Sequence, residues 1–298
     1  MTSKKSKSKT KSKSWYAKKS IVQSAEQTEN FMAFMHNYIF MSDIVVESKT
    51  WLEKDGCNIF LIGENHNTSK NIYAMFKSLV VDLKTRPDIP RIDLLLEVTQ
   101  ESDEMVFNNR ELYSEHMSQL NNVRFLFSKC SKTRDCEMDV HWMDPNQMNK
   151  NVSKKDLPCG TRGVKGTDRL PQWIYNLAKI PLKEAYRVTS IEEIQSEYDL
   201  LNIFTQHCVV LKEINRASRV NPRFTMEFAI PLFMELTNDF RKFSLVLRAY
   251  LSLRVILDFY TVARIIKSKM KNVLVYAGVN HTNNITLILE RLGFNIMS

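Results

Sequence analysis

The sequence predicts an α/β fold in which a mainly parallel sheet is flanked by helices. Short apolar runs, typical of buried strands, alternate with longer segments whose apolar residues recur at helical spacing, which is the pattern of βαβ units. The first and the last of these runs both lead into the residues Gly-x-Asn-His. The main departure from simple alternation is a large helical insertion, about residues 171–270, before the last strand and its helix.

The basic charge of the chain is concentrated in its first 20 residues. They hold eight lysines, from Lys4 to Lys19, and no acidic residue, so we expect a disordered tail. Its lysines are typical of a nuclear localisation signal or of weak contacts with nucleic-acid phosphates, and a purely solubilising tail is the alternative. Subtracting these eight lysines from 42 basic residues leaves 34 against 33 acidic ones. Residues 21–298 are therefore predicted to be one nearly neutral α/β domain, not a basic nucleic-acid-binding domain.

The first half of this domain contains three predicted strands. Apolar residues at helical spacing predict helices over 26–41 and 68–84, and a further helix near 110–120. Each of the three strands is a short apolar run, and the third is stopped by Pro145-Asn146. The strands are predicted at 57–63, 92–97 and 139–144.

The second half is predicted to be mostly helical. Residues 145–170 are polar and carry three of the seven glycines, which indicates a long loop. Residues 224–267 are apolar with few helix breakers, which predicts two long helices. A strand at 272–278 and a helix through Leu292 follow, with Gly293 at the helix C-cap and a final short strand at 294–297.

Cysteine usage and hydropathy indicate a reducing intracellular compartment. The five cysteines are odd in number and form no CxxC pair, so free thiols are favoured over disulfides. Free thiols are also favoured over a zinc site at Cys130, Cys136 and His141. No apolar segment follows the basic start, so we expect no secretion signal. The apolar stretch 243–263 contains Arg248, Arg254 and Asp258, which favours a buried helix of a soluble protein over a membrane span.

The candidate site lies where the predicted strands end. The first unit reads Gly63-Glu64-Asn65-His66 and the last reads Gly278-Val279-Asn280-His281. Because the carboxyl ends of parallel strands share one edge, we expect His66 and His281 to meet there with Glu64 and with the strand-end acids Glu97 and Asp144. The two glycines would allow close backbone approach to a ligand, which Asn65 and Asn280 would also contact.

Imidazoles and carboxylates at one edge indicate either a metal site or a general acid–base site. The metal ligands would be His66, His281, Glu97 and Asp144, around Mn, Zn or Fe. Each residue also has a structural alternative. For either histidine alone it is a helix cap, for Glu97 a capping or salt-bridged role, and for Asp144 a turn.

The motifs resemble those of the erythromycin-esterase/ChaN-like superfamily, which includes TraB- and Tiki-type proteins. The matching residues are Gly63 to His66, Glu97 with Glu101, and Gly278 to His281. The resemblance covers about 57–145 and 272–298. It implies an α/β fold with these His and Glu residues in one pocket, and either hydrolase activity, in some members metal-dependent, or binding of haem or iron compounds. The Lys-, Asn- and Ile-rich composition also resembles proteins of large DNA viruses.

A Gly-rich basic segment at 159–169 is a second candidate for ligand binding. Arg162 and Arg169 would bind an anionic substrate from a loop over the active edge, but a plain surface loop is favoured. The chain contains no HExxH, HxxEH or GxSxG motif. It therefore lacks the strand-to-helix turn on which serine esterases usually carry their nucleophilic serine.

Three functions follow from these patterns. The favoured one is a hydrolase acting on a small molecule or peptide through His66, Glu64, Glu97 and His281. The alternatives are a haem- or metal-binding protein without turnover, and a structural protein that works through its basic tail.

Overall fold

The computed structural model describes residues 25–65, 68–97, 119–127, 137–143, 210, 212–238, 245–268 and 271–297. The basic tail, most of the predicted helix near 110–120 and the Gly-rich segment 159–169 lie outside these residues. Cys57 lies within them and forms no disulfide, whereas Cys130 and Cys136 of the zinc alternative lie outside. Among the described helices, none combines the length and apolar character needed to cross a membrane.

The described residues form a six-stranded mixed sheet with the order β4-β3-β5-β2-β1-β6. The pairs β2–β5, β5–β3 and β3–β4 are parallel, and β1 is antiparallel to both of its neighbours. This confirms the predicted mainly parallel α/β sheet. The strands are β1 (Ser48–Lys54), β2 (Cys57–Glu64), β3 (Ile92–Leu96), β4 (Met138–Trp142), β5 (Asn272–Gly278) and β6 (Asn295–Met297).

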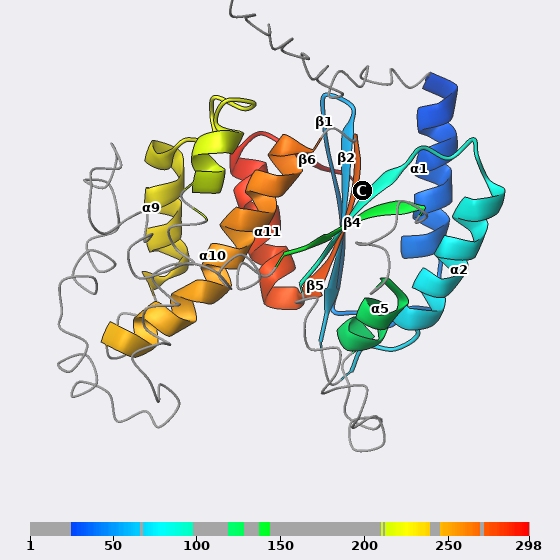
Figure 1. The fold of residues 1–298 in the computed structure, drawn as a ribbon, viewed down its shortest axis with the longest axis horizontal. Helices are drawn as coiled ribbons and strands as arrows, with labels where there is room; N and C mark the ends of the chain where they lie inside the picture. The colour runs from blue at the N-terminus through cyan, green and yellow to red at the C-terminus, as the bar shows by residue number, and fades with distance from the viewer. Residues whose placement is uncertain are drawn as a thin grey trace, which may run out of the picture.

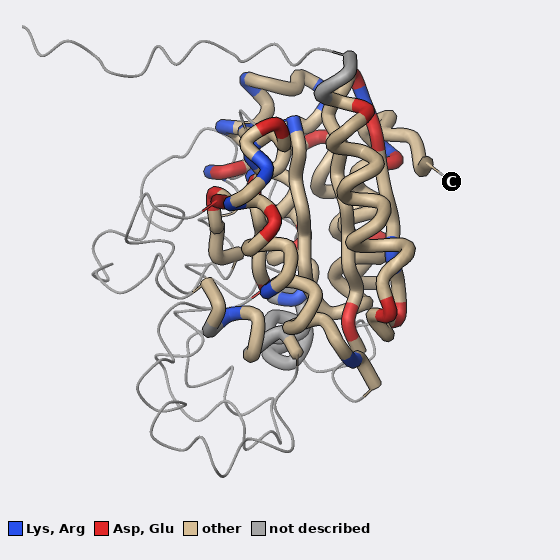
Figure 2. The backbone as a smooth tube through the Cα atoms, turned by 90° about the vertical axis from the view of Figure 1, so that its right-hand side faces the viewer, with Lys and Arg blue, Asp and Glu red and all other residues tan. Residues whose placement is uncertain are grey.

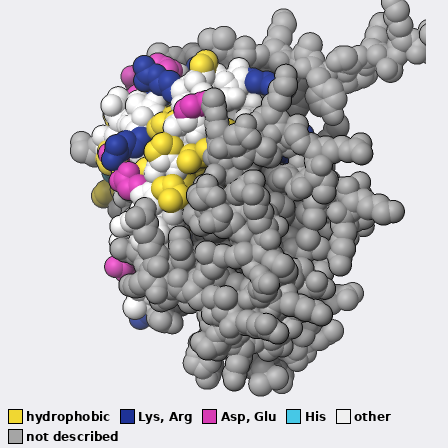
Figure 3. Space-filling model, turned by 90° about the vertical axis from the view of Figure 1, so that its left-hand side faces the viewer, with side chains coloured by type: hydrophobic (Ala, Val, Ile, Leu, Met, Phe, Trp, Pro, Cys, Tyr) yellow, Lys and Arg dark blue, Asp and Glu magenta, His cyan; other side chains and the backbone are white. Residues whose placement is uncertain are grey.

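Helices cover the sheet on both faces (Figure 1). One layer consists of α1 (Ala25–Ile39), α2 (Ile72–Thr85) and α5 (Gln119–Phe127), and Figure 2 looks onto it from outside. The other layer consists of α9 (Met226–Leu236), α10 (Leu245–Lys267) and α11 (Val279–Arg291). Figure 3 views this second side, where apolar side chains reach the surface between charged ones in the part that the structure describes.

The two cores follow from the alternation of side chains along the strands. In β2, Ile59 and Leu61 pack with α9, α10 and α11, whereas Phe60 and Ile62 pack with α1 and α2. All seven residues of β5 are buried, as expected for a central parallel strand covered on both faces. The apolar runs were therefore correctly interpreted as strands, and their alternation decides which layer each residue faces.

Connections from two neighbouring parallel strands leave on opposite faces of the sheet. β2 leads to α2 in one layer, and β5 leads to α11 in the other (Figure 1). In open α/β sheets such a divergence, at the carboxyl ends of the strands, is where ligands bind. The ends of β2 and β5 are the two places where the Gly-x-Asn-His strings lie.

Gly63 brings α11 close to β2. A Cβ atom at this position would lie 2.1 Å from Ser48 Oγ, 2.4 Å from Thr282 Oγ1 and 3.1 Å from Val279 Cα. Ser48 and Thr282 also lie 3.2 Å apart, oxygen to oxygen, as a hydrogen-bonded pair. The first turn of α11 can therefore pack against β2 only because residue 63 has no side chain.

We expect Gly63→Ala to lower the free energy of unfolding by about 1 to 3 kcal/mol, because the added methyl group must push α11 away from β2. Urea denaturation followed by circular dichroism measures the loss. Adding Ser48→Ala removes the nearest clashing atom and should recover part of the stability. A Gly63→Ala protein as stable as the natural one would show that the two elements are not packed this closely.

Candidate functional site

His281 lies in the first turn of α11, at the carboxyl edge of the sheet. Gly278 is both the last residue of β5 and the N-cap of α11, so helix follows strand directly. The helix begins at Val279, two residues before His281, so no turn separates the strand from the helix. The imidazole is therefore carried by a buried strand and by the helix that continues it.

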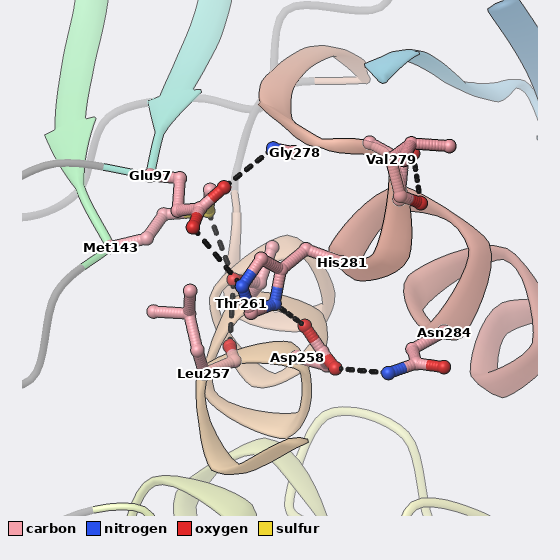
Figure 4. Close-up of polar contacts among 10 residues, drawn as sticks. Glu97, Met143, Leu257, Asp258, Thr261, Gly278, Val279, His281 and Asn284 are labelled. Atoms are coloured by element: carbon pink, nitrogen blue, oxygen red, sulfur yellow. Dashed lines mark hydrogen bonds and ion pairs between the residues drawn. The ribbon is translucent and has the colours of Figure 1, made fainter. Parts of the chain in front are cut away.

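Two carboxylates hold the His281 ring from opposite sides (Figure 4). Its Nε2 lies 3.0 Å from Glu97 Oε1, and its Nδ1 lies 2.6 Å from Asp258 Oδ1. Glu97 directly follows β3, and Asp258 lies within α10. The side chain of Asp258 is 0% exposed, whereas those of His281 and Glu97 are 13% and 19% exposed. Three separate elements thus meet at one imidazole.

Each carboxylate also accepts a hydrogen bond through its other oxygen. The backbone N–H of Gly278 donates to Glu97 Oε2 at 2.5 Å, and Asn284 Nδ2 donates to Asp258 Oδ2 at 2.7 Å. Glu97 therefore fills both structural roles left open by its sequence, because it caps the N-terminus of α11 and pairs with His281. An anionic group is favourable at a helix N-terminus.

The surroundings of His281 favour its charged form. Burial alone would lower its pKa, but the hydrogen bonds and charges of Asp258 and Glu97 outweigh burial and raise the pKa to about 10. Burial raises the pKa of Asp258 to about 6, against the opposing hydrogen bonds from His281 and Asn284. Between about pH 6 and about pH 10, His281 is therefore an imidazolium beside an ionised Asp258, and both of its ring nitrogens donate hydrogen bonds.

This arrangement suits proton transfer better than metal binding by His281. A metal ligand needs a free ring nitrogen, and both nitrogens of His281 face carboxylate oxygens. Within the described residues, no group of three or more His, Cys, Asp or Glu side chains is arranged to hold a metal ion. His66 and Asp144, two of the predicted metal ligands, lie outside the described residues, so the metal site stays a prediction.

Glu64 lies at the same edge but belongs to the other face of the sheet. It follows the alternation of Phe60 and Ile62, which pack on α1 and α2. Its buried carboxylate accepts a hydrogen bond from the hydroxyl of Tyr276, whose ring lies 5.4 Å from that of Phe76 in α2. Burial, followed by the charge and hydrogen bond of Glu64, raises the pKa of Tyr276. The structure therefore does not bring Glu64 together with His281.

The remaining predicted site residues are only partly placed. The backbone of Asn65 forms a turn with Thr68 and Ser69, and Asn280 is exposed on α11. Gly63 and Gly278 serve packing and capping, as described above. Arg162 and Arg169 lie outside the described residues.

Sequence reasoning missed Asp258 and Asn284. The signal for Asp258 was a single acidic residue in the apolar stretch 243–263, which we used only as an argument against a membrane span. The signal for Asn284 was its spacing, since residues three apart on a helix share a face and Asn284 follows His281 at that distance.

Comparisons of the chain with protein-family models, with curated proteins and with solved structures find no match.

Proposed function

We propose that this protein is a hydrolase of small molecules or peptides, with Glu97 as general base and His281 as proton donor. The single observation that carries the proposal is the His281 ring held between Glu97 and Asp258, at 3.0 and 2.6 Å, at the carboxyl edge of the sheet. Its place beside diverging parallel strands supports a ligand site there. The resemblance to the erythromycin-esterase/ChaN-like superfamily belongs to the same proposal.

The protonation states suggest which group accepts and which donates a proton. His281 keeps its proton at neutral pH, so it is the acid of the pair, and the Glu97 carboxylate is the acceptor. Glu97 takes a proton from water, the hydroxide formed attacks the substrate, and His281 Nε2 gives its proton to the leaving group. The proton gained by Glu97 then passes to Nε2 across the 3.0 Å contact, which restores the starting state.

A haem- or metal-binding protein without turnover is less well supported. Coordination through His281 would require the ring to leave one of its two carboxylates, and the contact with Asp258 is completely buried. The contact with Glu97 would be the one to break.

A substrate screen with matched variants tests the hydrolase. The substrates are chromogenic esters, lactones, peptides and phosphoesters, and we expect the natural chain to hydrolyse one of these classes. Glu97→Gln and His281→Gln should each lower kcat/KM by about 10²- to 10⁴-fold, because each removes one partner in proton transfer. The control is Glu290→Gln, which removes an exposed carboxylate on the same helix. Equal turnover by folded Glu97→Gln protein, or no hydrolysis of any class, would contradict the proposal.

A further inference from the structure

We propose that Asp258 and Asn284 are positioning residues that together hold the His281 ring in one orientation, with Nε2 directed at Glu97. The inference rests on the proposed function, because it assigns roles within the same site. It adds two residues that do not contact the reacting atoms and act only through His281.

Two side chains of α11, those of His281 and Asn284, bind the same carboxylate, that of Asp258 in α10. His281 Nδ1 lies 2.6 Å from Asp258 Oδ1, and Asn284 Nδ2 lies 2.7 Å from Oδ2 of the same side chain. His281 and Asn284 are one helical turn apart, so they reach the carboxylate side by side (Figure 4). With both oxygens bound, the plane of the carboxylate is fixed, and it fixes the ring through Nδ1.

α10 is itself anchored along the side that carries Asp258. Thr261 Oγ1 donates to the carbonyl of Leu257 at 2.8 Å and lies 2.9 Å from Met143 Sδ, just beyond β4. Further along, Arg264 Nη2 lies 2.8 Å from His141 Nδ1 in β4, and Ser268 donates to Asp93 in β3. Thr261, Arg264 and Ser268 follow one another at intervals of three and four residues, so these contacts set the rotation of α10 that directs Asp258 at His281.

Packing does not require a carboxylate at position 258. A fully buried carboxylate is costly unless it is paired and hydrogen-bonded, and apolar side chains of similar volume pack at least as stably in such places. What an apolar residue cannot do is accept the Nδ1 proton of an imidazolium and fix which nitrogen faces outward. A buried carboxylate that orients a catalytic imidazole in this way is worth several orders of magnitude in rate in the best-studied triad.

The Asp93–His141 pair on the same side of the sheet provides an internal comparison. His141 Nε2 lies 3.3 Å from Asp93 Oδ1, but its Nδ1 faces the guanidinium of Arg264 instead of a carboxylate. His141 thus has an acidic partner on one nitrogen only. His281 has acidic partners on both, Glu97 after β3 and Asp258 in α10, which is the arrangement that favours an oriented imidazolium.

Nuclear magnetic resonance of the full chain with ¹⁵N-labelled histidines tests the inference without a substrate. The His281 signals are assigned from the spectrum of His281→Gln. In the natural chain both ring nitrogens should remain protonated until about pH 10. In Asp258→Asn the midpoint should fall by about 1 to 3 pH units, because the amide carries no charge to stabilise the imidazolium. Asp93→Asn is the control and should change the His141 signals but not those of His281.

Asn284→Ala is the milder second variant, in case Asp258→Asn does not fold. It leaves the Asp258–His281 contact but frees one carboxylate oxygen, so the midpoint should fall by less and the ring signals should broaden as the orientation loosens. With a substrate in hand, Asp258→Asn should lower kcat far more than it changes KM.

The outcomes separate this inference from the proposed function. An unchanged midpoint in both folded variants overturns the positioning role, even where hydrolysis depends on Glu97 and His281. If the midpoint falls as expected but no substrate class is hydrolysed, the proposed function fails and the positioning of His281 stands.

Discussion

Replacing His281 by leucine is expected to lower the free energy of unfolding by about 3 to 5 kcal/mol. The imidazolium lies between Glu97 and Asp258, and the latter is completely buried. Without the cation, two carboxylates face each other across an apolar side chain, and the buried one has lost its ionic partner. Urea denaturation at neutral pH, followed by circular dichroism, measures the difference.

The cause of this loss can be tested by removing the charges as well. Adding Asp258→Leu and Glu97→Gln to His281→Leu should recover much of the stability, because apolar groups of similar volume often replace buried ion pairs without cost. His36→Leu, at an exposed position of α1, is the control for loss of a histidine elsewhere. If the single His281→Leu variant unfolds at the same urea concentration as the natural chain, the ion pairs do not stabilise the fold.

The stability of the natural chain is expected to fall by roughly 2 to 3 kcal/mol between about pH 7 and about pH 9 on account of His281. In the native state His281 has a pKa of about 10, against 6.5 for an ordinary histidine. In this window the unfolded chain has lost the proton while the native chain keeps it, so raising the pH favours the unfolded chain. The stabilisation is complete below pH 6.5 and is lost as the pH rises through about 10.

Chemical denaturation at several pH values in this window tests the prediction. His281→Gln should remove most of the dependence, whereas His36→Gln should preserve it. Asp258, with a native pKa of about 6, has titrated in both states before the window begins. Burial raises the pKa of Cys57 from 9.0 to about 11, so its contribution begins only at the upper end of the window and is the same in the natural chain and in His281→Gln. A natural chain whose stability changes no more steeply than that of His281→Gln would contradict a raised pKa at His281.

Most of the fold could be predicted because its central strands are continuous apolar runs. The strand β5 has the predicted bounds, and the glycine after α11 has the expected positive φ, 87°. There the N–H of Gly293 donates to the carbonyl of Glu290, and that of Phe294 to Leu289, as in a Schellman motif. A strand that is buried on both faces is apolar at nearly every position, so its own sequence identifies it without knowledge of the elements that pack against it.

Strand β1 was missed because only one of its seven residues, Leu52, is buried. The remaining positions are polar except for Trp51, so β1 has no apolar run. A local signal was nevertheless present, since Asp55-Gly56 is a strong two-residue hairpin turn. Both residues have positive φ, 53° and 73°, and Lys54 pairs with Cys57 across the turn. Turn chemistry would have identified this hairpin where hydropathy could not.

The site could be predicted only in part, for a geometric reason. Glu97 and His281 meet because the ends of parallel strands share an edge, which is readable from sequence. Glu64 does not join them, because a strand residue faces the side set by its register, and Glu64 faces the α2 side. Asp258 depends on the rotation and crossing of a helix that arrives from elsewhere in the chain, and no local pattern specifies that placement.

The two Gly-x-Asn-His strings lie in different structural contexts up to their asparagines, Asn65 and Asn280. Glu64 still belongs to β2 and pairs with Gly278, Asn65 lies outside both elements, and α2 begins only at Ile72. The second string forms the junction of β5 and the first turn of α11. The shared asparagine therefore lies in different backbone surroundings, because Asn65 follows the end of β2 outside any helix, whereas Asn280 lies in the first turn of α11.

That direct junction of β5 and α11 has a thermodynamic consequence for any reaction at His281. The residue is ordered as soon as the central strand and its helix form, so its conformational entropy is lost during folding and not when a substrate arrives. Substrate binding then needs to order only the substrate and the other groups that contact it, not His281. In the proposed hydrolase, more of the binding free energy is then available to lower the activation barrier.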